Sequence, residues 1–336
     1  MARVAYEPWN PRGEAQDMVV MANTICREYR AQGFDLTLRQ LYYQFVARGY
    51  IPNNQRSYKR LGDIVNRARL AGLLDWNYIV DRTRELKPVS HWRSPADVID
   101  AAHQGYAIDK WSDQPTRVEV WVEKEALAGV IGSAAHARDV AYFSCRGYVS
   151  QSELYTAAQR HMRYIAKGQN VVVLHLGDHD PSGIDMTRDI RTRLELFTDQ
   201  DWLNANVEEF GSDSVSLRAL RASMDERCEG RRALEVRRIA LNADQIEQYN
   251  PPPNPAKLTD SRSADYVEQY GDESWELDAL DPTVLAGLIN AEIDALIDPD
   301  AYYDRQVVET RDRDLLELAS NNWDELTEVL EGMGRE

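Results

Sequence analysis

The fold is decided by the stretch VVVLHLGDHDPSG, residues 171–183. An apolar run rich in β-branched residues, closed by glycine, charge and proline, is typical of a buried parallel strand. Upstream, the similar run VEVWV at 118–122 leads directly into Glu123. In an open α/β sheet, ligands bind at the carboxyl ends of such strands. The sequence therefore predicts that Glu123, Asp178 and Asp180 lie together at one edge of a sheet.

Three carboxylates at one edge indicate a metal site. Two such groups 4 Å apart repel each other by ~4 kcal/mol at an effective dielectric of 20. A hard, oxygen-seeking cation such as Mg2+ removes that repulsion. We therefore predict a metal-dependent site that acts on phosphates. The alternative is a solvated acidic turn whose backbone is set by Pro181 and Gly183.

Composition places the chain among ordinary globular proteins. Its 336 residues are enough for two domains, and the hydrophobic and charged fractions are 43% and 28%. No apolar stretch reaches the length of a membrane span, and the first residues lack a signal-peptide core. Cys26, Cys145 and Cys228 have neither metal nor disulfide spacing. We expect a cytoplasmic, DNA-associated protein with no membrane partner.

Charge is distributed unevenly along the chain. The net charge is −17, which argues against nonspecific affinity for nucleic acid. Residues 27–93 nevertheless hold 13 Lys and Arg against 6 Asp and Glu, a local balance of +7. Residues 271–336 hold 19 acids and 4 Arg. A basic N-terminal region is compatible with a phosphate-binding face, and a solvated surface is the alternative. The arginine pairs 231–232 and 237–238 either contact DNA or lie on solvated helix faces.

The N-terminal part is expected to be helical. One helix is predicted over 15–32, and a second begins at the capping box Thr37-Leu38-Arg39-Gln40. A third covers 58–72, and the apolar run 76–80 is predicted as a short strand. Three helices followed by a strand indicate a winged-helix-like DNA-binding domain over 1–93.

Strands and helices alternate in the middle of the chain. A connector at 94–115, with a helix near 95–103, comes first. The expected strands are 118–122, 139–144 and 171–176, and the expected helices are 124–136, 152–166 and one from Ile184. This alternation indicates a Rossmann-like parallel sheet with right-handed crossovers, assigned to a domain over 116–250. The remainder, 251–336, is predicted as a stiff proline-rich linker followed by an acidic helical extension.

Three segments resemble the Toprim domain in the variant found in the topoisomerase VI A subunit and the meiotic double-strand-break transesterase. They are VEKEAL at 122–127, CRGY at 145–148 and GDHDPSGI at 177–184. Those proteins pair a Glu-Lys-Asp/Glu-Ala-Leu segment with an Asp-x-Asp-Pro-x-Gly segment. The resemblance implies that Glu123, Asp178 and Asp180 carry the metal-binding carboxylates, with Mg2+ as the metal.

The N-terminal segment RQLYY at 39–43 resembles the family's Arg-Asp/Glu-x-Tyr-Tyr motif, and WELDAL at 275–280 is similar to a further family segment. The resemblance implies that Tyr43 is a nucleophile in a winged-helix domain, with Arg39 beside it. It further implies a type IIB topoisomerase-like transesterase that cleaves double-stranded DNA. In such a homodimer one subunit's Tyr43 meets the other's metal site, and a separate ATPase subunit is a possible partner. We also expect Glu123 to move a proton to the leaving 3′ oxygen.

Helical geometry separates the two tyrosines. The apolar stripe of the second helix places Tyr42 on the buried face, and Tyr43 lies about 100° away from it. Arg39 is four residues before Tyr43, on the same side, where a guanidinium favours the phenolate and binds phosphate. For the tyrosines, the alternative is that both are packing residues. For the protein, the alternatives are a Toprim-type nuclease using water and a protein that binds DNA without cleaving it.

Overall fold

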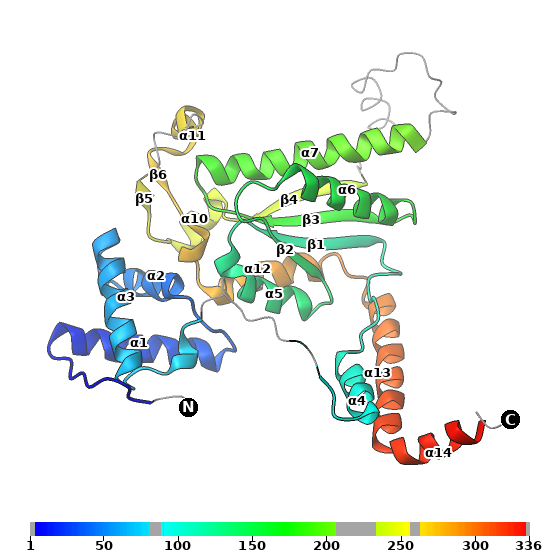
Figure 1. The fold of residues 1–336 in the computed structure, drawn as a ribbon. Coiled ribbons are helices and arrows are strands. Elements are labelled where there is room, and N and C mark those ends of the chain that lie inside the picture. Colours follow the sequence, from blue (N-terminus) through cyan, green and yellow to red (C-terminus); the bar gives the residue numbers. More distant parts are fainter. Residues whose placement is uncertain (1–3, 81–88, 90, 206–232, 256–262, 334–336) are drawn as a thin grey trace. The chain divides into compact units, whose positions relative to one another are not determined.

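The computed structural model describes residues 4–80, 89, 91–205, 233–255 and 263–333 (Figure 1). Cys228 and the arginine pair at 231–232 lie outside these residues. The chain groups into two compact units, one made of 1–84 with 118–295 and the other of 85–117 with 296–336. Among the described residues, no helix combines the length and apolarity needed to cross a bilayer.

A four-stranded parallel sheet forms the centre of the first unit, which confirms the predicted α/β class. Its strands are β1 Thr116–Val122, β2 Ala141–Ser144, β3 Asn170–Leu176 and β4 Leu234–Ala240. Their order across the sheet is β2-β1-β3-β4. The first three occupy the predicted strand positions, and the two central strands β1 and β3 are largely buried, which fits their apolar residues on both faces.

Helices cover both faces of this sheet, with α6 and α7 on one side and α5 and α12 on the other (Figure 1). Their bounds are α5 Ala128–His136, α6 Gln151–Ile165, α7 Pro181–Ala205 and α12 Pro282–Asp294. Leu154 of α6 and Leu194 of α7 pack with Val171 and Val173 of β3 in one core. A short 3-10 helix, η2 Glu125–Leu127, precedes α5, and α7 begins before the predicted Ile184 because Pro181 suits a first helical turn.

Three helices form the N-terminal part of the same unit: α1 Glu14–Ala31, α2 Leu38–Ala47 and α3 Gln55–Leu70. Ile25, Leu41, Phe45 and Leu61 form the centre of their shared core. The capping box at the start of α2 is confirmed. The Gln40 backbone N–H donates to the Thr37 hydroxyl at 3.2 Å, and the Thr37 N–H donates to the Gln40 side chain at 2.8 Å.

The predicted strand at 76–80 is wrong. Residues Trp76–Tyr78 form a 3-10 helix, η1. The Asp75 carboxylate accepts a hydrogen bond from the Asn77 N–H at 3.0 Å, and this local turn competes with extended backbone. Only Ile79 forms a bridge, to Leu36.

The proline-rich segment predicted as a linker instead joins a small sheet. After α10 Ala243–Tyr249, strand β5 Asn254–Pro255 pairs antiparallel with β6 Glu273–Ser274, and α11 Ser263–Tyr270 lies between them in the chain. Directly after β6, Trp275 exchanges two backbone hydrogen bonds with His179, at 2.8 and 2.9 Å. The segment 275–280, which includes η3 Leu277–Ala279, is thereby fixed beside the DHD turn at 178–180.

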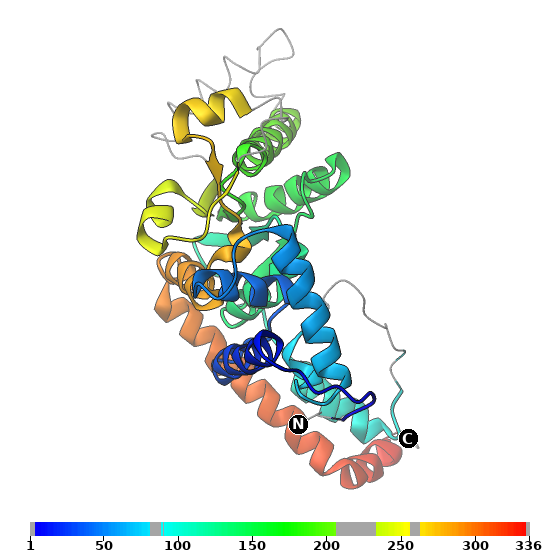
Figure 2. The same ribbon diagram turned by 90° about the vertical axis from the view of Figure 1, so that its left-hand side faces the viewer.

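The second unit is mostly helical, as predicted for 95–103 and for the acidic C-terminal region. It contains α4 Pro95–Gly105, α13 Pro299–Asn321 and α14 Trp323–Met333. The Lys110 ammonium bonds Glu309 of α13 at 2.5 Å, and Trp111 packs edge-on against Tyr302. In both views α13 and α14 meet at an elbow (Figures 1 and 2).

Candidate functional site

The sheet reverses its direction of winding between β1 and β3. The chain leaves β1 for β2 on one side, and leaves β3 for β4 on the other. Such a topological switch point opens a crevice at the carboxyl ends of the two central strands. The Glu123 N–H donates to the Leu176 carbonyl at 2.9 Å, so the two strand ends meet here. The structure brings Glu123 and Asp178 together at this point.

The Glu123 side chain is held at the edge by one hydrogen bond from the backbone. Its Oε2 accepts a hydrogen bond from the Asp178 N–H at 2.9 Å. Burial raises the pKa of Glu123 to about 7, and repulsion from Asp178 and Asp180 adds to the effect. Both effects favour the protonated form of Glu123 at this edge.

The two aspartates of the DHD turn face different partners. Asp178 is buried; its Oδ1 accepts from the Leu277 N–H at 2.8 Å, and its Oδ2 pairs with the Lys124 ammonium at 2.8 Å. Asp180 accepts from the Gly183 N–H at 2.6 Å and so begins α7. A Cβ at Gly183 would collide with the Asp178 carbonyl oxygen, which explains the glycine at this position.

Arg238 of β4 stabilises the DHD turn through hydrogen bonds to its backbone. Its guanidinium donates to the carbonyl oxygens of Gly177 at 2.9 Å, Asp178 at 2.6 Å and Gly183 at 2.9 Å. Burial lowers the pKa of Arg238 to about 10. The predicted solvated helix face is wrong for Arg238, because the residue lies on strand β4 and is largely buried. No local pattern in the sequence marks this role, because it depends on the pairing of β4 with β3.

Lys124 connects the turn to an acidic segment that the sequence identified only by resemblance. Its ammonium lies 2.8 Å from Asp178, 3.0 Å from Glu276 and 3.6 Å from Asp278. The Asp278 side chain is almost completely buried, with 1% exposed. Its carboxylate oxygens have no hydrogen-bond partner, so the positive charges nearby provide its compensation.

Arg39 of α2 approaches the same two carboxylates. Its guanidinium pairs with Glu276, and its Nε lies 3.1 Å from Asp278. The guanidinium carbon is 5.8 Å from the centre of the Tyr43 ring. The helix that carries Arg39 and Tyr43 is thus joined to Lys124, and through it to Asp178, by one shared pair of carboxylates.

The expectation that Tyr43 lies off the buried face is wrong. Its side chain is only 3% exposed, and that of Tyr42 is 5% exposed. The helical stripe accounts for one face of α2, but η3 packs against the helix as well, and its Ala279 belongs to the core of the N-terminal helices. Burial and the nearby Glu276 carboxylate raise the pKa of Tyr43 to about 12, and together they outweigh Arg39. In this arrangement Tyr43 is a protonated, covered phenol.

The donor set at the edge has the chemistry of a magnesium site. Carboxylate oxygens are the preferred ligands of hard divalent cations. A bound cation would stabilise the charged form of Glu123, which burial and the neighbouring aspartates disfavour. Within the described ranges, no three acidic, histidine or cysteine side chains already converge as a metal-binding group. Lys124 instead neutralises Asp178, and Asp180 caps α7.

Comparisons with protein-family models and with curated proteins give no match to this chain. The features that bear on its function are therefore those of the site: Glu123 and Asp178 at the switch point, the cations Lys124, Arg39 and Arg238, and Tyr43 beside Arg39.

Proposed function

We propose that this protein is a DNA-binding, Mg2+-dependent transesterase that resembles the type IIB topoisomerase A subunit. The proposal treats the parallel sheet as a Toprim domain and the N-terminal helices as a winged-helix-like domain. The observation that carries it is the shared carboxylate pair Glu276 and Asp278, which joins Arg39 on the tyrosine-bearing helix to Lys124 beside the DHD turn.

Glu123, Asp178 and Asp180 would hold the magnesium ion. When bound, Mg2+ supplies stabilisation of the negative charge that develops on a reacting phosphate. For Asp178 to serve as a ligand, Lys124 has to leave it. Lys124 keeps two other acidic partners, Glu276 and Asp278, so this exchange does not leave its charge unpaired.

Arg39 and Lys124 are proposed to bind the DNA backbone. Both cations face carboxylates in the protein alone, and a carboxylate and a phosphate offer similar acceptor oxygens to a guanidinium or an ammonium. Glu276 therefore holds the place that a phosphate takes in the complex. The local balance of +7 over residues 27–93 supports attraction of DNA to the tyrosine-bearing side.

In the proposed reaction the Tyr43 oxygen attacks a backbone phosphorus. A bond forms between that oxygen and the phosphorus, the bond to the 3′ oxygen breaks, and the 5′ phosphate stays on the protein. The phenol gives its proton to a water molecule, and the leaving 3′ oxygen takes one proton. Glu123 would donate the proton to the 3′ oxygen if it is released from the metal, and its buried position beside two aspartates favours its protonated form in the metal-free protein. We further propose a homodimer, in which one subunit's tyrosine serves the other's carboxylates, and an ATPase subunit as partner.

A hydrolytic nuclease is the second candidate, and the state of Tyr43 favours it. A buried phenol whose pKa is raised to about 12 is a poor nucleophile until it is uncovered. In this candidate, water replaces the tyrosine as the attacking group, and the products carry free 5′ phosphates.

Product chemistry tests both candidates. Supercoiled DNA is incubated with the protein and Mg2+, denatured with detergent, and examined for protein-linked 5′ ends. The transesterase predicts adducts in the wild type and in Tyr42→Phe, and none in Tyr43→Phe. Tyr42 is the matched control, because it is the neighbouring tyrosine, is similarly buried, and has a hydroxyl that bonds Asn53 at 2.8 Å. Free 5′ phosphates from Tyr43→Phe would establish the nuclease, and no cut under any condition would leave DNA binding alone.

A further inference from the structure

The elbow between α13 and α14 presents an uncovered apolar surface. Each helix carries side chains at the i, i+3, i+4, i+7 spacing of one helical face. On α13 these are Leu315, Leu318 and Ala319, followed by the C-cap residue Asn322, and on α14 they are Leu326, Val329, Leu330 and Met333. Leu318 is 61% exposed, Val329 60% and Met333 72%. A stripe of this kind normally faces a core, so its exposure on two successive helices marks a docking surface.

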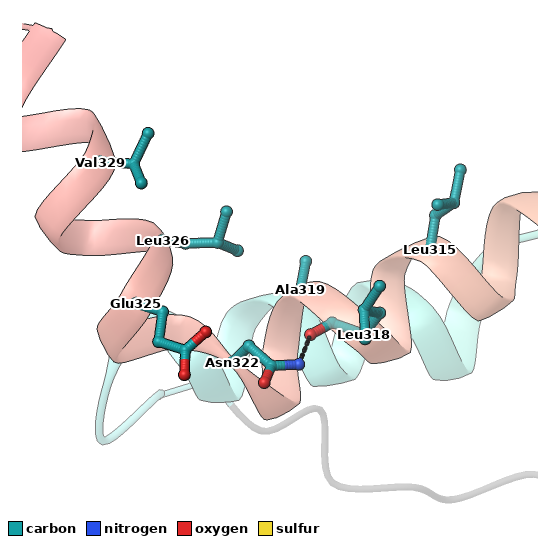
Figure 3. Close-up of a pocket in the computed structure, with 7 residues that line it drawn as sticks. All are labelled: Leu315, Leu318, Ala319, Asn322, Glu325, Leu326 and Val329. Atoms are coloured by element: carbon teal, nitrogen blue, oxygen red, sulfur yellow. Dashed lines mark hydrogen bonds between the residues drawn. The ribbon is translucent and has the colours of Figure 1, made fainter.

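Parts of both stripes line one groove of about 530 Å³ (Figure 3). Its lining residues are Leu315, Leu318, Ala319, Asn322, Glu325, Leu326 and Val329. We call it the α13–α14 groove. Asn322 fixes the bend, because its amide donates to the Leu318 carbonyl at 2.8 Å and its own carbonyl accepts from the Leu326 N–H at 3.1 Å. The end of α13 is tied to α4 by the Ser320 hydroxyl, which donates to the Ala96 carbonyl at 3.3 Å. The groove is therefore a shaped feature of the second unit.

One acid, Glu325, lines the groove, and the exposed acids of the two helices that form it are called here its acidic rim. The charged residues from Asp314 to Met333 are all acids, and all are exposed: Asp314, Glu317, Asp324, Glu325, Glu328 and Glu331. The arginines of α13 lie earlier in the helix and are engaged there. Arg305 pairs with Asp113, Arg311 with Asp312, and Arg313 donates to the His103 carbonyl. None of the described residues from 314 to 333 is basic.

We propose that the α13–α14 groove binds a basic amphipathic helix of a partner protein. The apolar floor fits the apolar face of such a helix, as in other helix-in-groove complexes. The acidic rim complements Lys and Arg on its flanks. The rim also argues against the pairing of two copies of this chain groove to groove, since that would bring two acidic rims together. This inference is independent of the proposed DNA chemistry.

The test uses full-length protein and a labelled helical probe peptide with leucines at the i, i+3, i+4, i+7 spacing and lysines elsewhere. A matched peptide carries glutamates in place of the lysines. The variants Leu318→Asp and Val329→Asp alter the groove. Leu196→Asp is the control, because Leu196 is an exposed leucine of α7 in the first unit, 43% exposed. Fluorescence anisotropy gives each Kd, circular dichroism checks that the variants are folded, and sedimentation gives the oligomeric state.

We expect the lysine peptide to bind the wild type, and the glutamate peptide not to bind. Each groove variant should weaken binding about tenfold or more, as loss of an apolar anchor does, while Leu196→Asp leaves it unchanged. The direction of the change in Kd is decisive, because an added aspartate would lower the Kd if the attraction to lysines were purely electrostatic. Equal or tighter binding by folded groove variants would overturn the proposal. So would a groove variant that dissociates a dimer without changing peptide affinity, since a second copy would then be the occupant.

Discussion

Two glutamates four residues apart, one within β1 and one directly after it, have opposite surroundings. Glu119 of β1 is 5% exposed and fully engaged. It accepts from the Arg160 guanidinium at 2.7 and 2.9 Å and from the Trp121 indole at 3.0 Å. Burial acts to raise its pKa, but the His161 and Arg160 contacts outweigh burial and hold the pKa well below its usual range. At Glu123 burial and two aspartates raise the pKa to about 7.

The difference shows how to distinguish a structural carboxylate from one available for function. Glu119 has donors for both oxygens and lies within the core beneath α6, so its charge is fully used by the fold. Glu123 ends the strand, receives one backbone N–H, and faces like charge. A buried group whose charge is left unbalanced is available for a ligand or a proton.

The largest effect should come from removing charge at the unbalanced position. Glu123→Gln is expected to lower Mg2+ affinity by more than the roughly 10–100-fold that loss of an outer-shell partner costs. Without metal its stability should stay within about 1 kcal/mol of wild type, because repulsion is relieved. Isothermal calorimetry and urea unfolding measure the two quantities. Wild-type Mg2+ affinity in the variant would remove Glu123 from the site.

Replacement of Glu119, whose charge is balanced, should instead lower stability strongly. Glu119→Ala leaves Arg160 and the Trp121 indole without their acceptor, and should reduce the free energy of unfolding by about 3–5 kcal/mol. The exposed Glu268 of α11 provides the control, and its replacement by alanine should change stability by no more than about 0.5 kcal/mol. Urea unfolding of both variants gives the comparison. Similar losses in the two would contradict a structural role for Glu119.

The pH dependence of stability should carry opposite signs for the two groups. Folded Glu123 binds more protons than the unfolded chain between its ordinary pKa of 4.5 and about 7, so its contribution falls as the pH rises through that window. Glu119 has a lowered pKa, so its contribution is present above 4.5 and is lost as the pH falls below it. In metal-free buffer, Glu123→Gln should remove a slope of at most about 1.4 kcal/mol per pH unit between pH 5 and 7. An unchanged slope would show that the pKa of Glu123 is ordinary.

The smallest expected effect is on DNA affinity, from replacing Glu276, which pairs with both Arg39 and Lys124. Glu276→Gln should raise DNA affinity about twofold to fivefold at low salt, since Arg39 and Lys124 lose a competing acceptor. Glu292→Gln removes the same charge elsewhere, where Glu292 pairs with Arg237, and controls for net charge. Filter binding across a salt series measures both. Equal gains in the two variants would assign the effect to net charge alone.

Much of the fold was predictable because its signals are local. Apolar runs defined three of the four strands, and the Thr37–Gln40 capping box began α2 where the sequence placed it. Strand β4 and the pairing of β5 with β6 were not predicted, because two-residue strands and a strand containing paired arginines lack an apolar run. The expected strand at 76–80 failed for the opposite reason, since a side-chain contact from Asp75 overrode an apolar pattern.

By itself, the sequence determined that acidic residues follow two buried strands, because parallel strands end at one edge and the chain places Glu123 and Asp178 there. The tertiary structure decided how those charges are balanced. Helical periodicity gives one buried face of α2, but the η3 segment, more than 200 residues away in the chain, covers Tyr43 as well. Burial and charge compensation depend on neighbours that come together only in the folded chain, and so they cannot be read from local pattern.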